Sequence, residues 1–210
     1  VLDRVLRHNL SNKMTVIGGY TEAIQHQTDD KDTIALTEQI LTAASELNSL
    51  VNKEREITRV LTDATPGKVV DLRQIVETSV SSVERTFPEA NIRLDIPDDP
   101  VRIVGGPLGR AVEELLQNAI IHSDLAAPSV SVRVWSRDDK ASLTVSDDGP
   151  GIPEADQDVV AGAEKIQPLL HGQGLGLWLV KIIVDQAGGT LRFDNNDPRG
   201  TIVTMQFSLA

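Results

Sequence analysis

The first 62 residues of the chain contain no proline, and their only glycines are the adjacent Gly18 and Gly19. Apolar residues recur there every three or four positions, which is the spacing of one face of an α-helix. A polar stretch at residues 28–32 interrupts the pattern and is typical of a short loop. The pattern predicts a helical hairpin, with helices about 40 Å long. Its apolar positions include Leu2, Val5, Leu6, Leu10, Met14, Ile17, Ile24, Leu36, Ile40, Leu47, Leu50, Ile57 and Leu61.

Two helices alone cannot cover an apolar surface of this extent. Pairing with a second copy of the hairpin would bury it in a four-helix bundle, so we expect a homodimer. The alternative for such a segment is a coiled-coil spacer that carries no chemistry.

Residues 63–67, which include Pro66 and Gly67, end the helical pattern and are expected to be a linker. From residue 68 to residue 210, short strand-like segments alternate with amphipathic helices. Residues 69–85 are expected to form a strand edge followed by a helix. Further strands are expected at 91–96, 101–104, 130–135, 141–146, 190–194 and 201–209, and further helices at 108–122 and 175–187. This order predicts an α+β domain with one mixed sheet and helices on one face.

The charge and composition exclude several classes of function. The formal net charge of −11 argues against a nucleic-acid partner, which needs a basic face. The chain has no cysteine, which excludes disulfides and thiolate chemistry. No apolar run approaches the roughly 18 residues of a membrane span, and no signal peptide is apparent. We therefore expect a cytoplasmic fragment without membrane contact, and any membrane anchor or sensor would lie upstream of it.

Asp outnumbers Glu and Arg outnumbers Lys in this acidic chain. Such a surface suits high salt, where ions screen the repulsion between its charges, so a halophilic origin is one interpretation. The other is an ordinary acidic bacterial protein.

The helix expected at 108–122 contains Glu114 and Asn118, which are four residues apart and therefore share a face. Asparagine has a poor helix propensity, and its amide oxygen is a suitable ligand for Mg²⁺. The alternative is a polar pair on a solvent-exposed face.

Two glycine-rich segments follow. Asp147 ends an expected strand and precedes Gly149, Gly151 and Ile152. A carboxylate in that position can accept a hydrogen bond from the amino group of adenine, although a plain acidic turn has the same composition. Further on, a helix opens with Gly172, Gly174, Leu175, Gly176 and Leu177. Free N–H groups at a helix N-terminus can bind phosphate. Leu177 breaks the Rossmann spacing, and no Walker loop is present.

The order and spacing of these segments resemble the ATP-binding domain of histidine kinases, which belongs to the GHKL superfamily and has the Bergerat fold. The resemblance covers about residues 68–210. Asn118 matches the N box, Asp147 with its glycines the first G box, and Gly172, Gly174 and Gly176 the second, while Gly200 and Thr201 match the last conserved segment. The resemblance implies that these residues bind ATP, with Mg²⁺ held by Asn118.

The hairpin fits the same family, whose members carry a phospho-accepting histidine in the first helix. His8 matches that position, and the resemblance implies that it takes the γ-phosphoryl group of ATP and passes it to an aspartate of a response-regulator receiver domain. Asn12 lies one turn further on, where family members orient water for dephosphorylation of the partner. The pattern Arg7-His8-Asn9-Leu10 looks like that of haloarchaeal kinases.

Several positions depart from the family pattern. Asn9 stands where many members carry a carboxylate, and it can hydrogen-bond but cannot take a proton. Glu114 replaces the first asparagine of the N box and is expected to act as a general base or as an outer partner of Mg²⁺. His122 occupies the aromatic or histidine position, and Lys165, in the segment between the G boxes, could contact the γ-phosphate.

These features leave two alternatives beside the kinase. One is a signalling scaffold or phosphatase that binds nucleotide but phosphorylates weakly, which Asn9 favours. The other is a GHKL ATPase unrelated to histidine phosphorylation, which Glu114 favours and His8 opposes.

Overall fold

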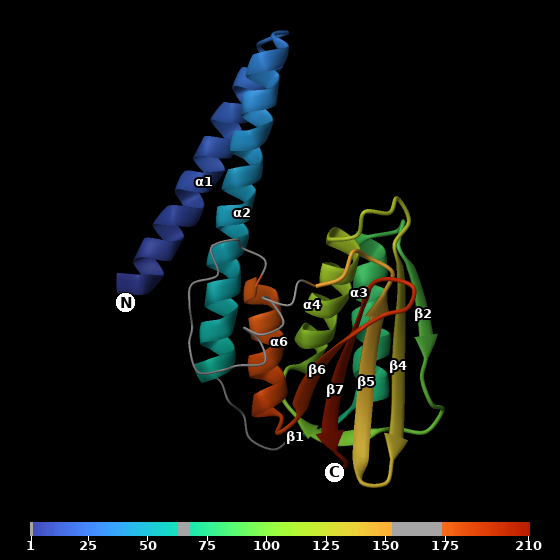
Figure 1. Cartoon of the computed structure of the whole chain (residues 1–210). Coiled ribbons are helices and arrows are strands. Elements are labelled where there is room, and N and C mark those ends of the chain that lie inside the picture. The colour runs from blue at the N-terminus through green and yellow to red at the C-terminus, as the bar shows by residue number, and fades with distance from the viewer. Residues whose placement is uncertain (1, 63–67, 153–173) are drawn as a thin grey trace. The chain divides into compact units, whose positions relative to one another are not determined.

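The structure, a computed structural model, describes residues 2–62, 68–152 and 174–210 and divides the chain into two compact units, Val1–Thr58 and Arg59–Ala210 (Figure 1). The first unit is a hairpin of α1 (Leu2–His26) and α2 (Lys31–Thr62). Asp30 caps α2, since its Oδ2 accepts a hydrogen bond from the backbone N–H of Thr33 at 3.0 Å. The last residues of α2 belong to the second unit.

The two helices of the hairpin are joined by few buried residues. Thr21, Thr37 and Ala44 are buried, and Ser11 Oγ donates a hydrogen bond to Asn48 Oδ1 at 3.0 Å between the helices. Many large apolar side chains of α1 and α2 remain exposed, among them Val16, Tyr20, Ile24, Leu36, Ile40 and Leu47. Among the described residues, no helix is both long enough and apolar enough to cross a membrane.

The second unit is built on a five-stranded sheet with the strand order β2-β4-β5-β7-β6. Strand β2 is parallel to β4, and the other neighbours are antiparallel. The bounds are β2 (Asn91–Asp95), β4 (Ser129–Arg137), β5 (Lys140–Asp147), β6 (Thr190–Asn195) and β7 (Thr201–Ser208).

A separate two-stranded sheet pairs β1 (Lys68–Asp71) with β3 (Arg102–Gly105) in antiparallel register. The single sheet expected from the sequence is thus two sheets among the described residues. The segment between β2 and β3 contains Pro97 and Pro100, which lack a backbone donor and interrupt strand pairing. Strand β2 therefore pairs with β4, while β3 turns back to β1.

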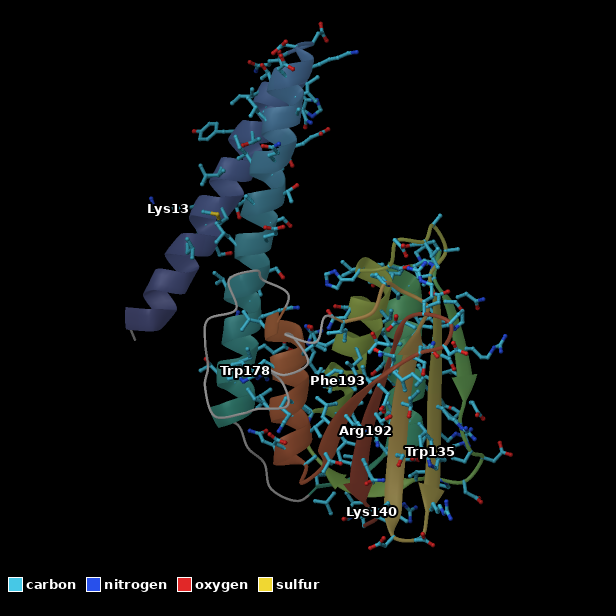
Figure 2. The ribbon with its side chains drawn as sticks, in the orientation of Figure 1. Lys13, Trp135, Lys140, Trp178, Arg192 and Phe193 are labelled. Atoms are coloured by element: carbon cyan, nitrogen blue, oxygen red, sulfur yellow. The ribbon has the colours of Figure 1, made fainter. Side chains whose placement is uncertain are left out.

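Three helices cover one face of the five-stranded sheet: α3 (Leu72–Thr86), α4 (Leu108–Ile121) and α6 (Gly174–Gln186) (Figure 1). Alternate residues of the central strands face these helices and form the aliphatic core, including Val130, Val132, Leu143, Val145, Val203 and Met205. The intervening residues, including Trp135 and Arg192, lie on the other face of the sheet (Figure 2). The α+β prediction, a helical hairpin followed by a two-layer domain, is confirmed.

Helix α4 carries both a buried and an exposed large aliphatic side chain and therefore offers a test of the fold. Leu116 is fully buried, whereas Ile121 on the same helix is 59% exposed. We expect Leu116→Ala to lower the free energy of unfolding by about 2–5 kcal/mol, through lost burial and the cavity left behind. Ile121→Ala is the matched control and should change it by about 0.5 kcal/mol or less. Urea unfolding followed by circular dichroism measures both, and equal effects would contradict this assignment of the core.

Candidate nucleotide-binding site

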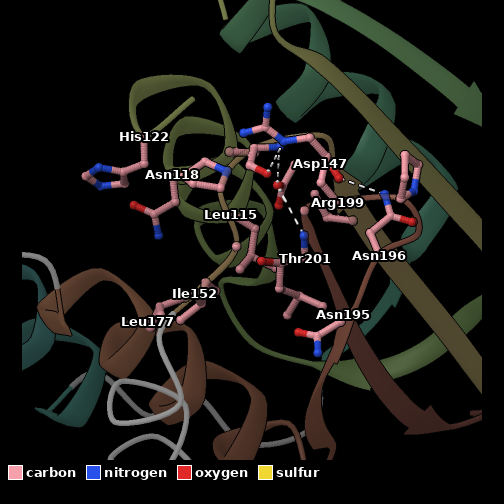
Figure 3. A pocket seen from close by; sticks show the side chains of 18 residues that line it. Leu115, Asn118, His122, Asp147, Ile152, Leu177, Asn195, Asn196, Arg199 and Thr201 are labelled. Atoms are coloured by element: carbon pink, nitrogen blue, oxygen red, sulfur yellow. Dashed lines mark hydrogen bonds between the residues drawn. The ribbon is translucent and has the colours of Figure 1, made fainter. Parts of the chain in front are cut away.

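A cavity of about 830 Å³ lies between α4, the end of β5, the start of α6 and the loop that joins β6 to β7 (Figure 3). Helix α4 contributes one wall, and the residues that follow β5 contribute another. The lining residues are Leu115, Asn118, Ala119, His122, Val145, Asp147, Gly149, Pro150, Gly151, Ile152, Leu177, Asn195, Asn196, Pro198, Arg199, Gly200, Thr201 and Val203. Aliphatic walls with a few polar groups are typical of a small-molecule site.

Asp147, the last residue of β5, is held from two sides. Its Oδ1 accepts hydrogen bonds from the backbone N–H of Gly149 at 2.9 Å and of Thr201 at 3.2 Å. Its Oδ2 makes no hydrogen bond within the described part of the chain and is left for a ligand donor. Burial raises the pKa of this carboxyl, and the two backbone donors oppose that rise because they stabilise the ionised form.

Glycines allow the backbone to approach Asp147 this closely. A Cβ at Gly200 would lie 1.9 Å from the main-chain oxygen of Asp147, and Gly200 has φ +108, a conformation that L side chains rarely adopt. Asn196 also holds the loop against β5, because its Nδ2 donates a hydrogen bond to the main-chain oxygen of Asp147 at 2.7 Å. The β6–β7 loop is therefore pressed against the end of β5.

Helix α4 brings only part of its predicted site to the cavity. Asn118 and His122 lie one turn apart on the face that lines it (Figure 3). Glu114 is not among the lining residues. Its side chain is 1% exposed, and Arg110 Nη2 donates to its Oε1 at 2.6 Å. The arginine one turn earlier thus captures the carboxylate that the sequence places beside Asn118.

The remaining predicted residues fall into four groups. Gly149, Gly151, Ile152, Leu177 and Thr201 line the cavity, while Gly174, Leu175 and Gly176 form the first turn of α6. Lys165 and Gly172 lie outside the described residues. His8, Asn9 and Asn12 lie in α1, where Asn12 is exposed.

Sequence reasoning missed three polar lining residues, which are Asn195 at the end of β6 and Asn196 and Arg199 in the β6–β7 loop. It also missed Asp124, which follows α4. Arg199 donates from Nη2 to both carboxylate oxygens of Asp124, at 2.8 and 3.0 Å, and from Nε to the oxygen of Gly149 at 3.1 Å. The one local signal was the position of Arg199 directly before Gly200 and Thr201.

Comparison with known proteins identifies relatives of the chain. The relatives include the signal transduction histidine-protein kinase/phosphatase MprB of Mycobacterium sp. (strain KMS), which is 32% identical over 178 residues, or 81% of this chain and 34% of that protein. The probable sensor histidine kinase TcrY of Mycobacterium tuberculosis is 28% identical over 88% of this chain and 40% of that protein. The chain thus spans about a third of the length of MprB. These relatives are mycobacterial and do not support the haloarchaeal likeness.

Solved structures agree in fold. A structure of the mycobacterial sensor histidine kinase MprB has 31% identity and a TM-score of 0.58, and covers 68% of this chain and 97% of its own. The Acinetobacter baumannii histidine kinase AdeS has a TM-score of 0.64 over 96% of this chain and 98% of its own, and its 22% identity shows the fold alone.

A family model described as histidine kinase-, DNA gyrase B- and HSP90-like ATPase matches residues 104–210, which include every described residue that lines the cavity. The chain belongs to this ATPase family.

Proposed function

We propose that the chain is the catalytic core of a two-component sensor histidine kinase. Residues 1–62 would form the dimerisation and phosphotransfer hairpin, 63–67 the linker and 68–210 the ATP-binding domain. One observation carries the proposal: a carboxylate with one oxygen held and one left for a donor, at the wall of a cavity that Asn118 also lines.

Base recognition follows from Asp147. Its Oδ1 is committed to two backbone donors, so Oδ2 is the atom that would accept a hydrogen bond from the 6-amino group of adenine. The aliphatic residues Leu115, Ile152 and Leu177 border the same cavity and suit the faces of a purine. A guanine or hypoxanthine ring presents a 6-oxo acceptor there instead and would be disfavoured.

The phosphates require groups at the other end of the site. The first turn of α6, opened by Gly174 and Gly176, would offer free N–H groups to phosphate oxygens, together with Gly172. Asn118 would contribute an oxygen to Mg²⁺, and Lys165 a charge near the γ-phosphate. No cluster of three or more acidic, histidine or cysteine ligands occurs in the described segments, which suits a Mg²⁺ held mainly by phosphates and water. That ion would neutralise charge on the transferring phosphoryl group.

The transfer itself would use His8. An imidazole nitrogen attacks the γ-phosphorus, the bond to the β–γ bridging oxygen breaks, and ADP leaves. Asn9 can orient the imidazole by a hydrogen bond but cannot accept its proton. The phosphoryl group then passes to an aspartate of a response-regulator receiver domain. Glu114 would reach the water around Mg²⁺, or act as a base, only after its ion pair with Arg110 opens.

A homodimer is part of the proposal. The apolar side chains exposed on the hairpin are too many for a surface in water, and a second hairpin would cover them in a four-helix bundle. A cytoplasmic location follows from the need for ATP and a receiver domain.

A phosphatase with weak kinase activity is the second candidate. It is favoured by Asn9 and by the relatives that are named kinase/phosphatase. In both readings Asn12, which is exposed on α1 one turn after His8, would orient the water that attacks the phosphorylated partner.

The kinase proposal predicts that the phosphoryl group becomes attached to the imidazole of His8. The chain and the His8→Gln variant are incubated with γ-labelled ATP and Mg²⁺, at low and at molar salt. The chain should acquire acid-labile, base-stable label, and His8→Gln should acquire none. His26→Gln, in the last turn of the same helix, is the matched control and should be labelled normally. Label that appears only at molar salt would support a halophilic origin. Nucleotide binding without label at either salt concentration would contradict the kinase and favour the second candidate.

Asp147→Asn should change which base is bound. Two backbone donors hold the amide oxygen at the Oδ1 position, so the amide N–H₂ faces the ligand. This N–H₂ group would face the 6-amino group of ATP, so that two donors meet, whereas it can donate a hydrogen bond to the 6-oxo group of ITP. We expect ATP affinity to fall about 10- to 100-fold and the preference over ITP to be lost or reversed, as measured by calorimetry. Asp148→Asn is the control, since Asp148 accepts from Ser129 N and does not line the cavity. Unchanged ATP affinity in Asp147→Asn would contradict adenine recognition by this residue.

Asn12→Ala should separate the two activities. We expect normal labelling of His8 but slower loss of phosphate from a receiver domain that the chain has phosphorylated, by about tenfold or more. Lys13→Ala, the adjacent exposed residue, should leave both unchanged. Equal dephosphorylation rates for Asn12→Ala and the parent would remove Asn12 from the mechanism.

A further inference from the structure

We propose that Arg199 is a positioning residue for nucleotide binding: it ties Asp124 to Gly149 and thereby fixes the base-recognition end of the cavity. This inference rests on the proposed function as a nucleotide-binding domain. It concerns Arg199 and Asp124, neither of which belongs to the site predicted from the sequence.

The Arg199 guanidinium joins three loops that are distant in sequence. Asp124 lies in the loop between α4 and β4, Gly149 follows β5, and Arg199 lies in the loop between β6 and β7. Nη2 of Arg199 contacts both carboxylate oxygens of Asp124, at 2.8 and 3.0 Å, while Nε donates to the oxygen of Gly149 at 3.1 Å. Arginine suits this bridge because its planar fork presents several donors at fixed angles.

The bridge leads directly to the carboxylate that would read adenine. Gly149 is held on both sides, since its oxygen accepts from Arg199 and its N–H donates to Asp147 Oδ1. The second donor to that oxygen, the N–H of Thr201, lies two residues after Arg199. A shift of Arg199 would therefore displace both donors that orient Asp147.

The exposure of the pair decides where its effect should appear. The side chains of Arg199 and Asp124 are 43% and 58% exposed, so the ion pair adds little to folding stability. A hydrogen bond from Arg199 lowers the pKa of Asp124, which is the direction expected for a carboxylate paired with a cation. Loops that are ordered before binding need not be ordered by the ligand, so the effect should appear in nucleotide affinity.

The simpler interpretation is a surface ion pair without consequence. The chain provides a matched control for it, because Arg192 Nη2 contacts Asp194 Oδ1 at the same 2.8 Å and neither residue lines the cavity. The two ion pairs differ in their hydrogen-bond connections to the residues of the cavity. Of these two pairs, only that of Arg199 is linked to Asp147 by hydrogen bonds among the described residues, through Gly149.

The experiment is a double-variant cycle in the full chain, with ATP and ITP binding measured by calorimetry at low salt. Arg199→Ala and Asp124→Ala should each weaken ATP binding about three- to tenfold, and the double variant should bind no worse than Arg199→Ala. Discrimination between ATP and ITP should fall in the same variants, which a merely structural residue would not cause. Arg192→Ala should match the parent, and molar salt should reduce the penalties because it screens the pair.

Three results would overturn the inference. Arg199→Ala could bind ATP with the affinity of the parent, or it could lose no more ATP affinity than Arg192→Ala. The third result is a double variant whose loss of ATP affinity equals the sum of the two single losses. Thermal unfolding is recorded for each variant. If Arg199→Ala does not fold, Asp124→Ala decides the question, since it removes only an exposed carboxylate. Failure of the parent itself to bind ATP would refute the proposed function, a result distinct from parental affinity in the variants.

Discussion

The site depends on the close approach of the β6–β7 loop to the end of β5. Antiparallel pairing of β5 with β7 sets Ser146 opposite Ile202, so that the chain enters β7 beside Asp147. Gly200 leaves the space that the main-chain oxygen of Asp147 occupies, and Thr201 can then donate to the carboxylate. The pairing that builds the sheet thus also orients the group that would recognise the ligand.

Local patterns predicted the elements of this fold better than their pairing. Strands β4 and β5 alternate apolar and polar residues around the turn near Asp138, so their hairpin could be expected. The parallel pairing of β2 with β4 joins Asn91 to Ser129 across β3, α4 and the segments that connect them. No pattern within a strand specifies a neighbour that far away, and the division into two sheets was therefore not foreseen.

The same limit applies to the site. Asn118, Asp147 and the glycines are unusual for their positions and could be recognised one segment at a time. The contact between Asp124 and Arg199 spans 75 residues and has no local signature. Glu114 shows a different limit, because helical spacing places it one turn from Arg110 as well as from Asn118. A buried carboxylate is stabilised by the cation, so that neighbour captures it.

Charge explains how an acidic chain could bind a polyanion. Arg199 is the single Lys or Arg among the described residues that line the cavity, and Asp124 neutralises it. Basic side chains of this lining therefore cannot supply most of the attraction for phosphates. Under the proposed function, backbone N–H groups at the start of α6 and a divalent cation would supply that attraction. Under the same proposal, Asp147 and Arg199, the acidic and the basic side chain among the described lining residues, would serve to orient the base.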